Sequence, residues 1–162
     1  MRWDFHPEGS EWTEAAIDAL QRHGAQLPTL VPSDIATFCP AYEANSLEER
    51  QAFWAGLFSA LAKHESTWRP DASGGGGQWI GLLQISPRSA GYYGCQAQSI
   101  VALKDGPANL ACAIRIAAQQ VPKDNMVAGN GRQGVGRDWA PLRSEEKRAD
   151  IAAWTRSQSY CR

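Results

Sequence analysis

The hydrophobic positions along the chain recur mostly at helical spacing. The clearest stretch is SLEERQAFWAGLFSALAKHE, which begins at Ser46 and ends at Glu65. Ser46 and Glu49 have the spacing of a capping box at a helix start, and apolar residues from Phe53 to Leu61 follow at helical steps. This apolar face is too wide for a surface helix, so we expect the central helix of the core.

Three further stretches show the same periodicity. They are TEAAIDALQRHG (13–24), GPANLACAIRIAAQQV (106–121) and SEEKRADIAAWTRSQ (144–158). Gly24 suits a helix stop, Pro107 a first turn and Ser144 an N-cap. PSDIATFCP is expected to form one helical turn capped by Ser33. The pattern predicts a mostly α protein.

Between these helices the pattern changes twice. QWIGLLQIS (78–86) is a short apolar run typical of extended chain, and SPRSAGYYGC after it is rich in turn residues. Residues 122–143 are rich in Gly, Asp, Asn and Pro, and a loop of that length inside one domain is often functional. With 162 residues and no repeat or linker, we expect one domain with one core.

Charge and composition exclude two classes of protein. The formal net charge is −1 and no basic cluster occurs, which argues against a nucleic-acid partner. No apolar run is long enough to span a membrane. The start, MRWDFHPEGSEW, lacks the apolar stretch of a secretory signal, so the protein is expected to begin in the cytosol unless a signal was removed.

The cysteine count indicates an oxidising compartment. An even number of cysteines in a small chain favours two disulfides; four buried free thiols are the alternative. Zinc is disfavoured because there is no CxxC pair and no cysteine has a nearby histidine. Three pairings are possible. We favour Cys95 with Cys112, and Cys39 with Cys161, which would fasten the chain end to the front half.

Glu65 is the candidate for acid chemistry, because it ends the buried stripe of the central helix. Burial and the negative end of the helix dipole both raise a carboxyl pKa, and a protonated carboxyl is what general-acid cleavage of a glycosidic bond requires. Trp68 offers a flat face to a sugar ring, while Ser66 and Gln84 can hydrogen-bond its polar groups. The alternative is a helix-end glutamate paired with Arg69.

Two other site types are excluded, and no metal or cofactor is expected. The run Gly74–Gly77 lacks the Gly-Lys-Ser/Thr ending of a phosphate loop, and no helix follows it. HESTW is not a zinc-protease site, because no second histidine lies four residues on. His64 is therefore expected to be structural or solvent-facing.

ESTWRPDAS…GLLQISPRSA resembles the signature of the soluble lytic transglycosylases, lysozyme-like enzymes that cut the bacterial cell wall. The matching residues are Glu65, Ser66, Trp68, Pro70, Ala72, Ser73, Gly81, Leu82 and Gln84. Leu83 replaces the usual methionine, and LKDGPANLACAIRI resembles a later block in which Asn109 matches. Together the blocks cover residues 46–120.

The resemblance implies a lysozyme-like α fold, of the goose-type lysozyme kind, over residues 1–162. Residues 1–45 would be an N-terminal extension packing on a motif-bearing core, 46–120. Glu65 would be the catalytic acid, with Ser66 and Gln84 beside the scissile bond. The remaining expected substrate contacts are Trp68, Tyr93 and Asn109.

One departure concerns the tyrosine that approaches the catalytic acid in this family. Its usual Tyr-Asn-Ala-Gly block is replaced by MVAGNGRQGVG, so either Tyr92 or Tyr93 substitutes, or the helper is absent. Hydrolysis would also need a second carboxylate. We interpret Asp71 as a loop acid in preference to a catalytic base. The lack of a matching second carboxylate favours the anhydro-forming route, in which the sugar's own 6-hydroxyl closes on the anomeric carbon.

We therefore expect a glycosidase cutting the β-1,4 bond between N-acetylmuramic acid and N-acetylglucosamine, of lytic transglycosylase or muramidase type. The favoured setting is an antibacterial effector delivered into a rival periplasm, for example by type VI secretion, with an immunity protein covering the cleft. Alternatives are an N-acetylglucosaminidase, a phage-type endolysin, and a non-catalytic glycan-binding module.

Overall fold

The computed structural model describes all 162 residues and is mostly helical, as the sequence predicts. The helices are α1 (Gly9–Gln21), α2 (Gln26–Thr29), α3 (Ile35–Phe38), α4 (Leu47–Glu65), α5 (Pro87–Tyr92), α6 (Ile100–Leu103), α7 (Gly106–Asp124) and α8 (Glu145–Ser157). One antiparallel sheet pairs β1 (Ser73–Gly74) with β2 (Trp79–Ile80). Short 3₁₀ turns are η1 (Tyr42–Ala44), η2 (Gly75–Gly77), η3 (Gly134–Arg137), η4 (Ala140–Arg143) and η5 (Ser159–Cys161). No helix is both long and apolar enough to cross a membrane.

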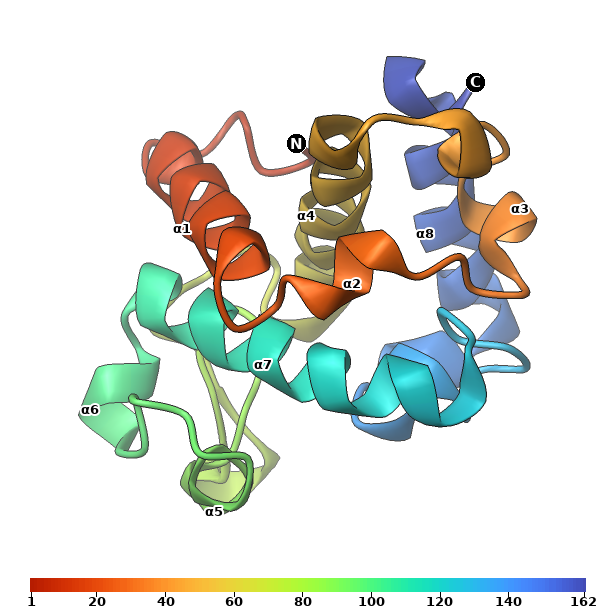
Figure 1. Cartoon of the computed structure of the whole chain (residues 1–162). Helices are drawn as coiled ribbons and strands as arrows, with labels where there is room; N and C mark the ends of the chain where they lie inside the picture. The colour runs from red at the N-terminus through yellow and green to blue at the C-terminus, as the bar shows by residue number, and fades with distance from the viewer.

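Helix α4 is the centre of the fold, and its predicted capping box is confirmed. The Ser46 hydroxyl accepts a hydrogen bond from the Glu49 amide, and the Glu49 carboxylate accepts one from the Ser46 amide. In Figure 1, α4 stands between α1 and α8 while α7 crosses in front of its lower end. Because its interior residues are buried on nearly every side, the helix holds its last residue, Glu65, at a fixed place.

The first 45 residues belong to the same core as α4. Trp3 and Trp12 are fully buried in a single hydrophobic cluster of 42 residues that also includes much of α4 and α7. Gly106, at the start of α7, leaves space for the Trp12 indole, which a side chain at this position would meet. The N-terminal segment therefore completes the core.

Two expectations about helix ends are wrong. Helix α7 continues through Pro122 and ends at Asp124. A proline in the last turn removes only one backbone hydrogen bond, so the helix can include it. Asn125, with φ 51°, then ends the helix in the left-handed conformation. Ser33 does not cap α3: its hydroxyl donates to the Asn125 carbonyl at 2.8 Å.

The segment 122–143, expected to be a structureless loop, has ordered parts. It contains η3 and η4. The carboxylate of Asp34, in the N-terminal part of the chain, also binds this segment. The Asp34 oxygens accept hydrogen bonds from the amides of Val127, Ala128 and Gly129 at 2.7–3.0 Å. The turn-rich stretch 86–95 likewise contains α5, whose N-cap hydroxyl, from Ser86, accepts from the Ser89 amide.

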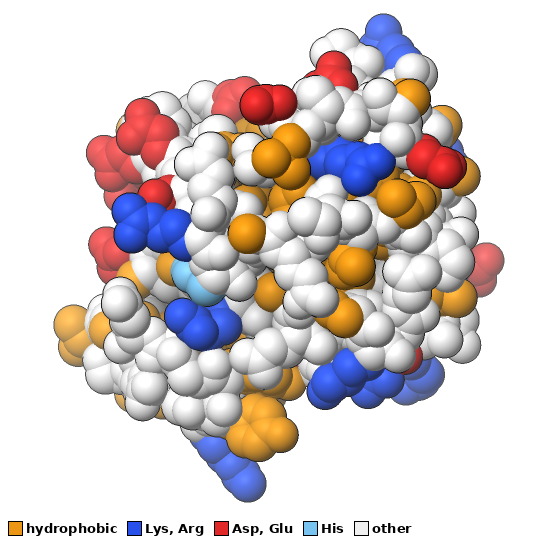
Figure 2. Space-filling view, viewed as in Figure 1, with side chains coloured by type: hydrophobic (Ala, Val, Ile, Leu, Met, Phe, Trp, Pro, Cys, Tyr) orange, Lys and Arg blue, Asp and Glu red, His pale blue; other side chains and the backbone are white.

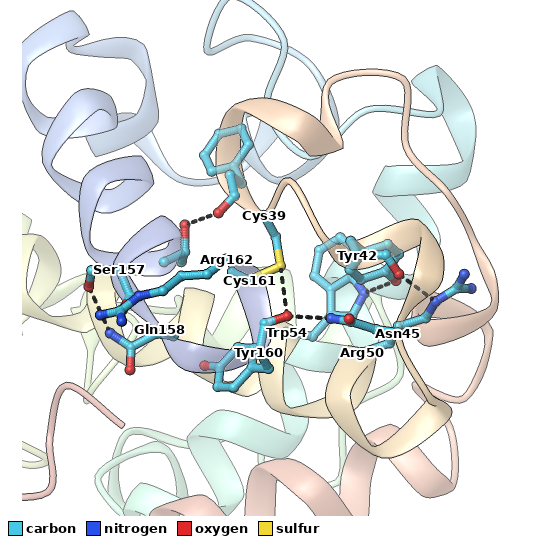
Figure 3. Close-up of a disulfide and its surroundings, with 12 residues drawn as sticks. Cys39, Tyr42, Asn45, Arg50, Trp54, Ser157, Gln158, Tyr160, Cys161 and Arg162 are labelled. Carbon is cyan, nitrogen blue, oxygen red and sulfur yellow. Dashed lines mark hydrogen bonds between the residues drawn. A yellow bond between two sulfur atoms is a disulfide. The ribbon is translucent and has the colours of Figure 1, made fainter.

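Both predicted disulfides are present in the structure. Cys39 is bonded to Cys161, which joins the end of α3 to the C-terminus, and Cys95 is bonded to Cys112 in α7. Around the first disulfide, Asn45 donates to the Tyr160 carbonyl at 2.5 Å, so the last residues are held by hydrogen bonds as well (Figure 3).

Charge on the face shown in Figure 2 is uneven but forms no basic stripe. Acidic side chains gather over α1, which carries Glu11, Glu14 and Asp18. Elsewhere on this face, lysines and arginines are scattered among apolar and neutral side chains. This face lacks the continuous positive surface that phosphate backbones require.

Candidate active site

A cleft of about 460 Å³ opens at the C-terminal end of α4. Its walls come from the end of α4, the β1–β2 region, the start of α5, the middle of α7 and the η3–η4 segment. The lining residues are Glu65, Trp79, Gln84, Ile85, Ser86, Ser89, Ile116, Arg137, Asp138, Trp139, Ala140, Pro141 and Arg143. The cleft thus combines two acids, two arginines and two tryptophans.

Glu65 lies in this cleft as an unpaired, largely buried carboxyl group. It makes no side-chain hydrogen bond and no ion pair, and Arg69 does not neutralise it. Burial raises the pKa of Glu65 from 4.5 to about 8, against a smaller opposing effect of the Lys147 charge. The group is therefore mostly protonated at neutral pH, as a proton donor must be.

His64, the residue before Glu65, ties the last turn of α4 to a cluster of polar and charged side chains. The His64 ring lies 2.7 Å from the Asp150 carboxylate of α8, which also binds the Arg2 guanidinium with two hydrogen bonds of 2.8 and 3.1 Å. The Arg2 hydrogen bond, followed by that of His64, holds the pKa of Asp150 well below its usual range. His64 is structural.

Gln84 faces Glu65's cleft with its amide group held in one orientation. It has φ 49°, and its side-chain nitrogen donates to the carbonyls of Ala72 at 3.3 Å and Gly81 at 3.0 Å. Its amide oxygen accepts no hydrogen bond from the chain. That oxygen is available to a hydroxyl or amide N–H of a ligand.

Ser66 and Trp68 do not line the cleft. Ser66 is buried, and its hydroxyl donates to the Ala62 carbonyl at 3.4 Å. Trp68 folds back on α4, donates its indole N–H to the Ser59 carbonyl at 2.9 Å and packs edge-on against Phe5. Both side chains support the turn that follows Glu65.

Asn109 is fully buried and binds the backbone of the segment that forms one wall of the cleft. Its oxygen accepts from the Leu83 amide at 2.9 Å, and its nitrogen donates to the carbonyls of Ile80 and Leu103 at 2.9 and 3.0 Å. Three hydrogen bonds from one side chain fix the segment that carries Gln84. Asn109 is thus placed to position the site and does not contact the cleft.

Tyr93 reaches the cleft through Asp138, a second acid that no sequence motif indicates. The Tyr93 hydroxyl donates to one Asp138 oxygen at 3.3 Å, and the Gln120 amide donates to the other at 2.6 Å and to the Tyr93 oxygen at 2.8 Å. Burial, followed by the Asp138 charge, raises the pKa of Tyr93 to about 12. Asp71 and Tyr92 are exposed and lie outside the cleft lining.

Most of the other cleft residues that no sequence motif indicates come from the segment 137–143 and from β2, and Ile85, Ser86, Ser89 and Ile116 complete the lining. Trp139 is buried and donates its indole N–H to the Leu83 carbonyl at 2.9 Å. The amide N–H of the same leucine donates to Asn109, so Leu83 is held at both of its backbone polar groups. Arg143 is held by the carbonyls of Gly136 and Arg137. Trp79, by contrast, is 44% exposed and follows Gln78 directly after the run of glycines.

No cluster of three or more His, Cys, Asp or Glu side chains has the arrangement of a metal site. The chemistry available to the cleft from this chain is proton transfer from Glu65 together with hydrogen bonding and apolar contact.

Comparison with known proteins gives the family. The profile of the family described as Transglycosylase SLT domain matches residues 43–131, which include Glu65, Gln84 and Asn109. Three similar solved structures are those of Bd0314 DslA in its wild-type form 2 and in two glutamate-to-glutamine mutants. Each is 31% identical and covers 99% of this chain and 96% of its own, with TM-scores of 0.88, 0.89 and 0.87 respectively. No curated protein matches. The chain belongs to the SLT transglycosylase-domain family and has its lysozyme-like fold.

Proposed function

We propose that the protein is a peptidoglycan glycosidase that cuts the β-1,4 bond between N-acetylmuramic acid and N-acetylglucosamine, with Glu65 as general acid. Family membership supports a lytic-transglycosylase-like function on peptidoglycan. The observation that carries the residue assignment is the unpaired Glu65 carboxyl in the cleft, with a pKa raised to about 8. Gln84 offers a free amide oxygen to the sugar beside it.

The reaction begins with transfer of the Glu65 proton to the bridging oxygen. The bond from that oxygen to the anomeric carbon then breaks, its electron pair stays on the leaving sugar's oxygen, and positive charge develops on the remaining ring. The Glu65 carboxylate next takes a proton from the nucleophile that attacks the anomeric carbon. If the nucleophile is the sugar's own 6-hydroxyl the product is an anhydro sugar, and if it is water the product is a reducing end.

We favour the anhydro route. Asp138 is the other cleft acid, but both of its oxygens already accept hydrogen bonds from Tyr93 and Gln120. Glu65 is thus the one cleft carboxyl without a partner in the chain, which supports a mechanism in which one group serves as acid and then as base. A muramidase would use the same acid and would need a water held by Asp138.

Mass spectrometry of purified peptidoglycan digested by the protein tests the proposal. Anhydro-muramic ends identify a transglycosylase, reducing muramic ends a muramidase and reducing glucosamine ends an N-acetylglucosaminidase. The Glu65→Gln variant, which keeps the shape and removes the acid, should release none of these. A wild-type protein that binds the wall without releasing fragments would instead be a glycan-binding module.

We further propose that the protein is an antibacterial effector acting in the periplasm of a target cell, neutralised by an immunity protein that covers the cleft. Two disulfides favour an oxidising compartment, and peptidoglycan lies there. Expression in bacteria with and without a periplasmic signal tests this: toxicity should require the signal. Toxicity in the cytosol alone would contradict it, and lysis only together with a membrane-permeabilising protein would favour a phage-type endolysin.

A further inference from the structure

The run Gly74–Gly77 lies at the edge of the cleft, next to two of the side chains that line it. In the structure, two cleft-lining side chains lie directly over its first two residues. A Cβ atom on Gly74 would come within 2.5 Å of the Gln84 amide oxygen, and one on Gly75 would come within 2.5 Å of the Trp79 indole nitrogen. The missing side chains therefore make room for Gln84 and Trp79.

Trp79 is unusual among the seven tryptophans of the chain. It is the one tryptophan among the exposed large hydrophobic side chains, at 44%, and its indole N–H makes no hydrogen bond. In the same cleft, Trp139 is 3% exposed and its N–H is satisfied by a carbonyl. Leaving a large apolar ring in water forgoes burial energy, and Trp79 lines a cleft that also holds polar and charged side chains. Aromatic side chains beside a few polar groups in a cleft are typical of ligand sites.

We propose that Trp79, resting on the backbone of Gly75, is a sugar-stacking platform that binds one pyranose ring of the glycan strand next to the bond attacked with Glu65. The inference rests on the proposed function, because it takes the substrate to be a glycan. The indole lies against Gly75, and Trp79 is one of the residues that line the cleft. The apolar C–H face of a pyranose ring would cover it, while the ring hydroxyls remain free to bond to polar groups such as Gln84.

The glycines fit this platform position by position. Gly75, Gly76 and Gly77 have φ of 57°, 70° and 92°, a region that favours glycine at each. Of these three, only Gly75 has the indole against it, and nothing lies within 4 Å of a Cβ built on Gly76 or Gly77. The loop thus contains one glycine that supports the platform and two whose constraint is conformational alone.

Binding of soluble glycan strands, released from peptidoglycan by an amidase, tests the platform without catalysis. All proteins carry Glu65→Gln so that the strands stay intact, and affinity is measured by calorimetry. Adding Trp79→Ala should weaken binding about tenfold, the effect expected for uncovering part of one aromatic ring. Trp79→Phe should keep most of the affinity. Tyr92→Ala, which removes an aromatic that is 82% exposed outside the cleft lining, should change nothing.

The two glycines provide a matched pair. Gly75→Ala and Gly76→Ala both place a side chain at positive φ, so both strain the loop by a similar amount. Only Gly75→Ala pushes the indole away, so it should lose affinity as Trp79→Ala does, while Gly76→Ala should bind nearly as the parent does.

Equal affinity of the Trp79→Ala protein and its parent would overturn the platform, as would equal losses in the two glycine variants. A parent that binds no strands would overturn it too. The proposed function has a separate readout, since it fails if the wild-type protein leaves the strands uncut. A protein that cuts strands while Trp79→Ala has no effect on binding would keep the function and lose the platform.

Discussion

Replacing Glu65 by glutamine should make the protein more stable at alkaline pH than the wild type, and leave stability nearly unchanged at acid pH. The reason is the buried carboxyl. Burial raises its pKa in the folded protein from 4.5 to about 8, whereas in the unfolded chain it titrates near 4.5. Glutamine removes this titration while keeping nearly the same shape.

The sign and size follow from proton linkage. Below pH 4.5 the group is protonated in both states and contributes no pH dependence. Between pH 4.5 and 8 the unfolded chain loses the proton that the folded protein keeps, so stability falls as pH rises, and above 8 the cost is constant. At 1.36 kcal/mol per pH unit, the cost reaches roughly 3 kcal/mol at pH 7 and roughly 5 kcal/mol above pH 8.

Urea unfolding of both proteins at pH 4 and pH 8.5 measures this. The difference in unfolding free energy between Glu65→Gln and wild type should grow by several kcal/mol from pH 4 to pH 8.5. In thermal unfolding, each kcal/mol of this difference should appear as a shift of roughly 2–4 °C in melting temperature. Glu14→Gln, at an exposed glutamate of α1, is the control and should show no such growth. A difference that is the same at both pH values would refute the buried, protonated state of Glu65.

Four further outcomes are expected. Glycan cleavage should fall on the alkaline side with an apparent pKa near 8 in kcat/KM profiles, because the free enzyme loses its acid there; a limb near 5 would contradict this. Asn109→Leu should lower the free energy of unfolding by about 3 kcal/mol in urea, because three backbone partners are left unpaired. Replacing Cys39 and Cys161 together by serine should cost about 3–5 kcal/mol in the same assay, since the bridge closes a loop with a sequence separation of 122. Asp138→Asn should leave the anhydro fraction of the products unchanged in mass spectrometry, and a marked rise in that fraction would show that Asp138 directs water.

The elements with strong local signals could be predicted from the sequence. The capping box at Ser46 and the apolar face of α4 located Glu65 at the end of a buried helix, and the structure has that helix from Leu47 to Glu65. The helix ends were harder where tertiary contacts decide. Pro122 is accommodated in the last turn of α7, and Ser33 gives its hydroxyl to the Asn125 carbonyl in place of its own helix.

The composition of the cleft could be predicted only in part. Glu65 and Gln84 come together as the motif indicates, but Trp68, three residues from Glu65, turns away because Thr67 and Trp68 itself have φ of 53° and 58°. Asp138 and Trp139 come from a segment far along the chain. They reach the cleft through hydrogen bonds to Gln120 and Leu83, which no local pattern encodes.

The most direct test of the central claim is the rate at which the folded Glu65→Gln protein cuts soluble glycan strands at pH 6, compared with wild type and Glu14→Gln. Loss of a general acid should lower the rate by about 10²–10⁴-fold, while circular dichroism shows an intact fold and Glu14→Gln cuts at the wild-type rate. Cleavage by Glu65→Gln within a few fold of wild type would show that another group donates the proton.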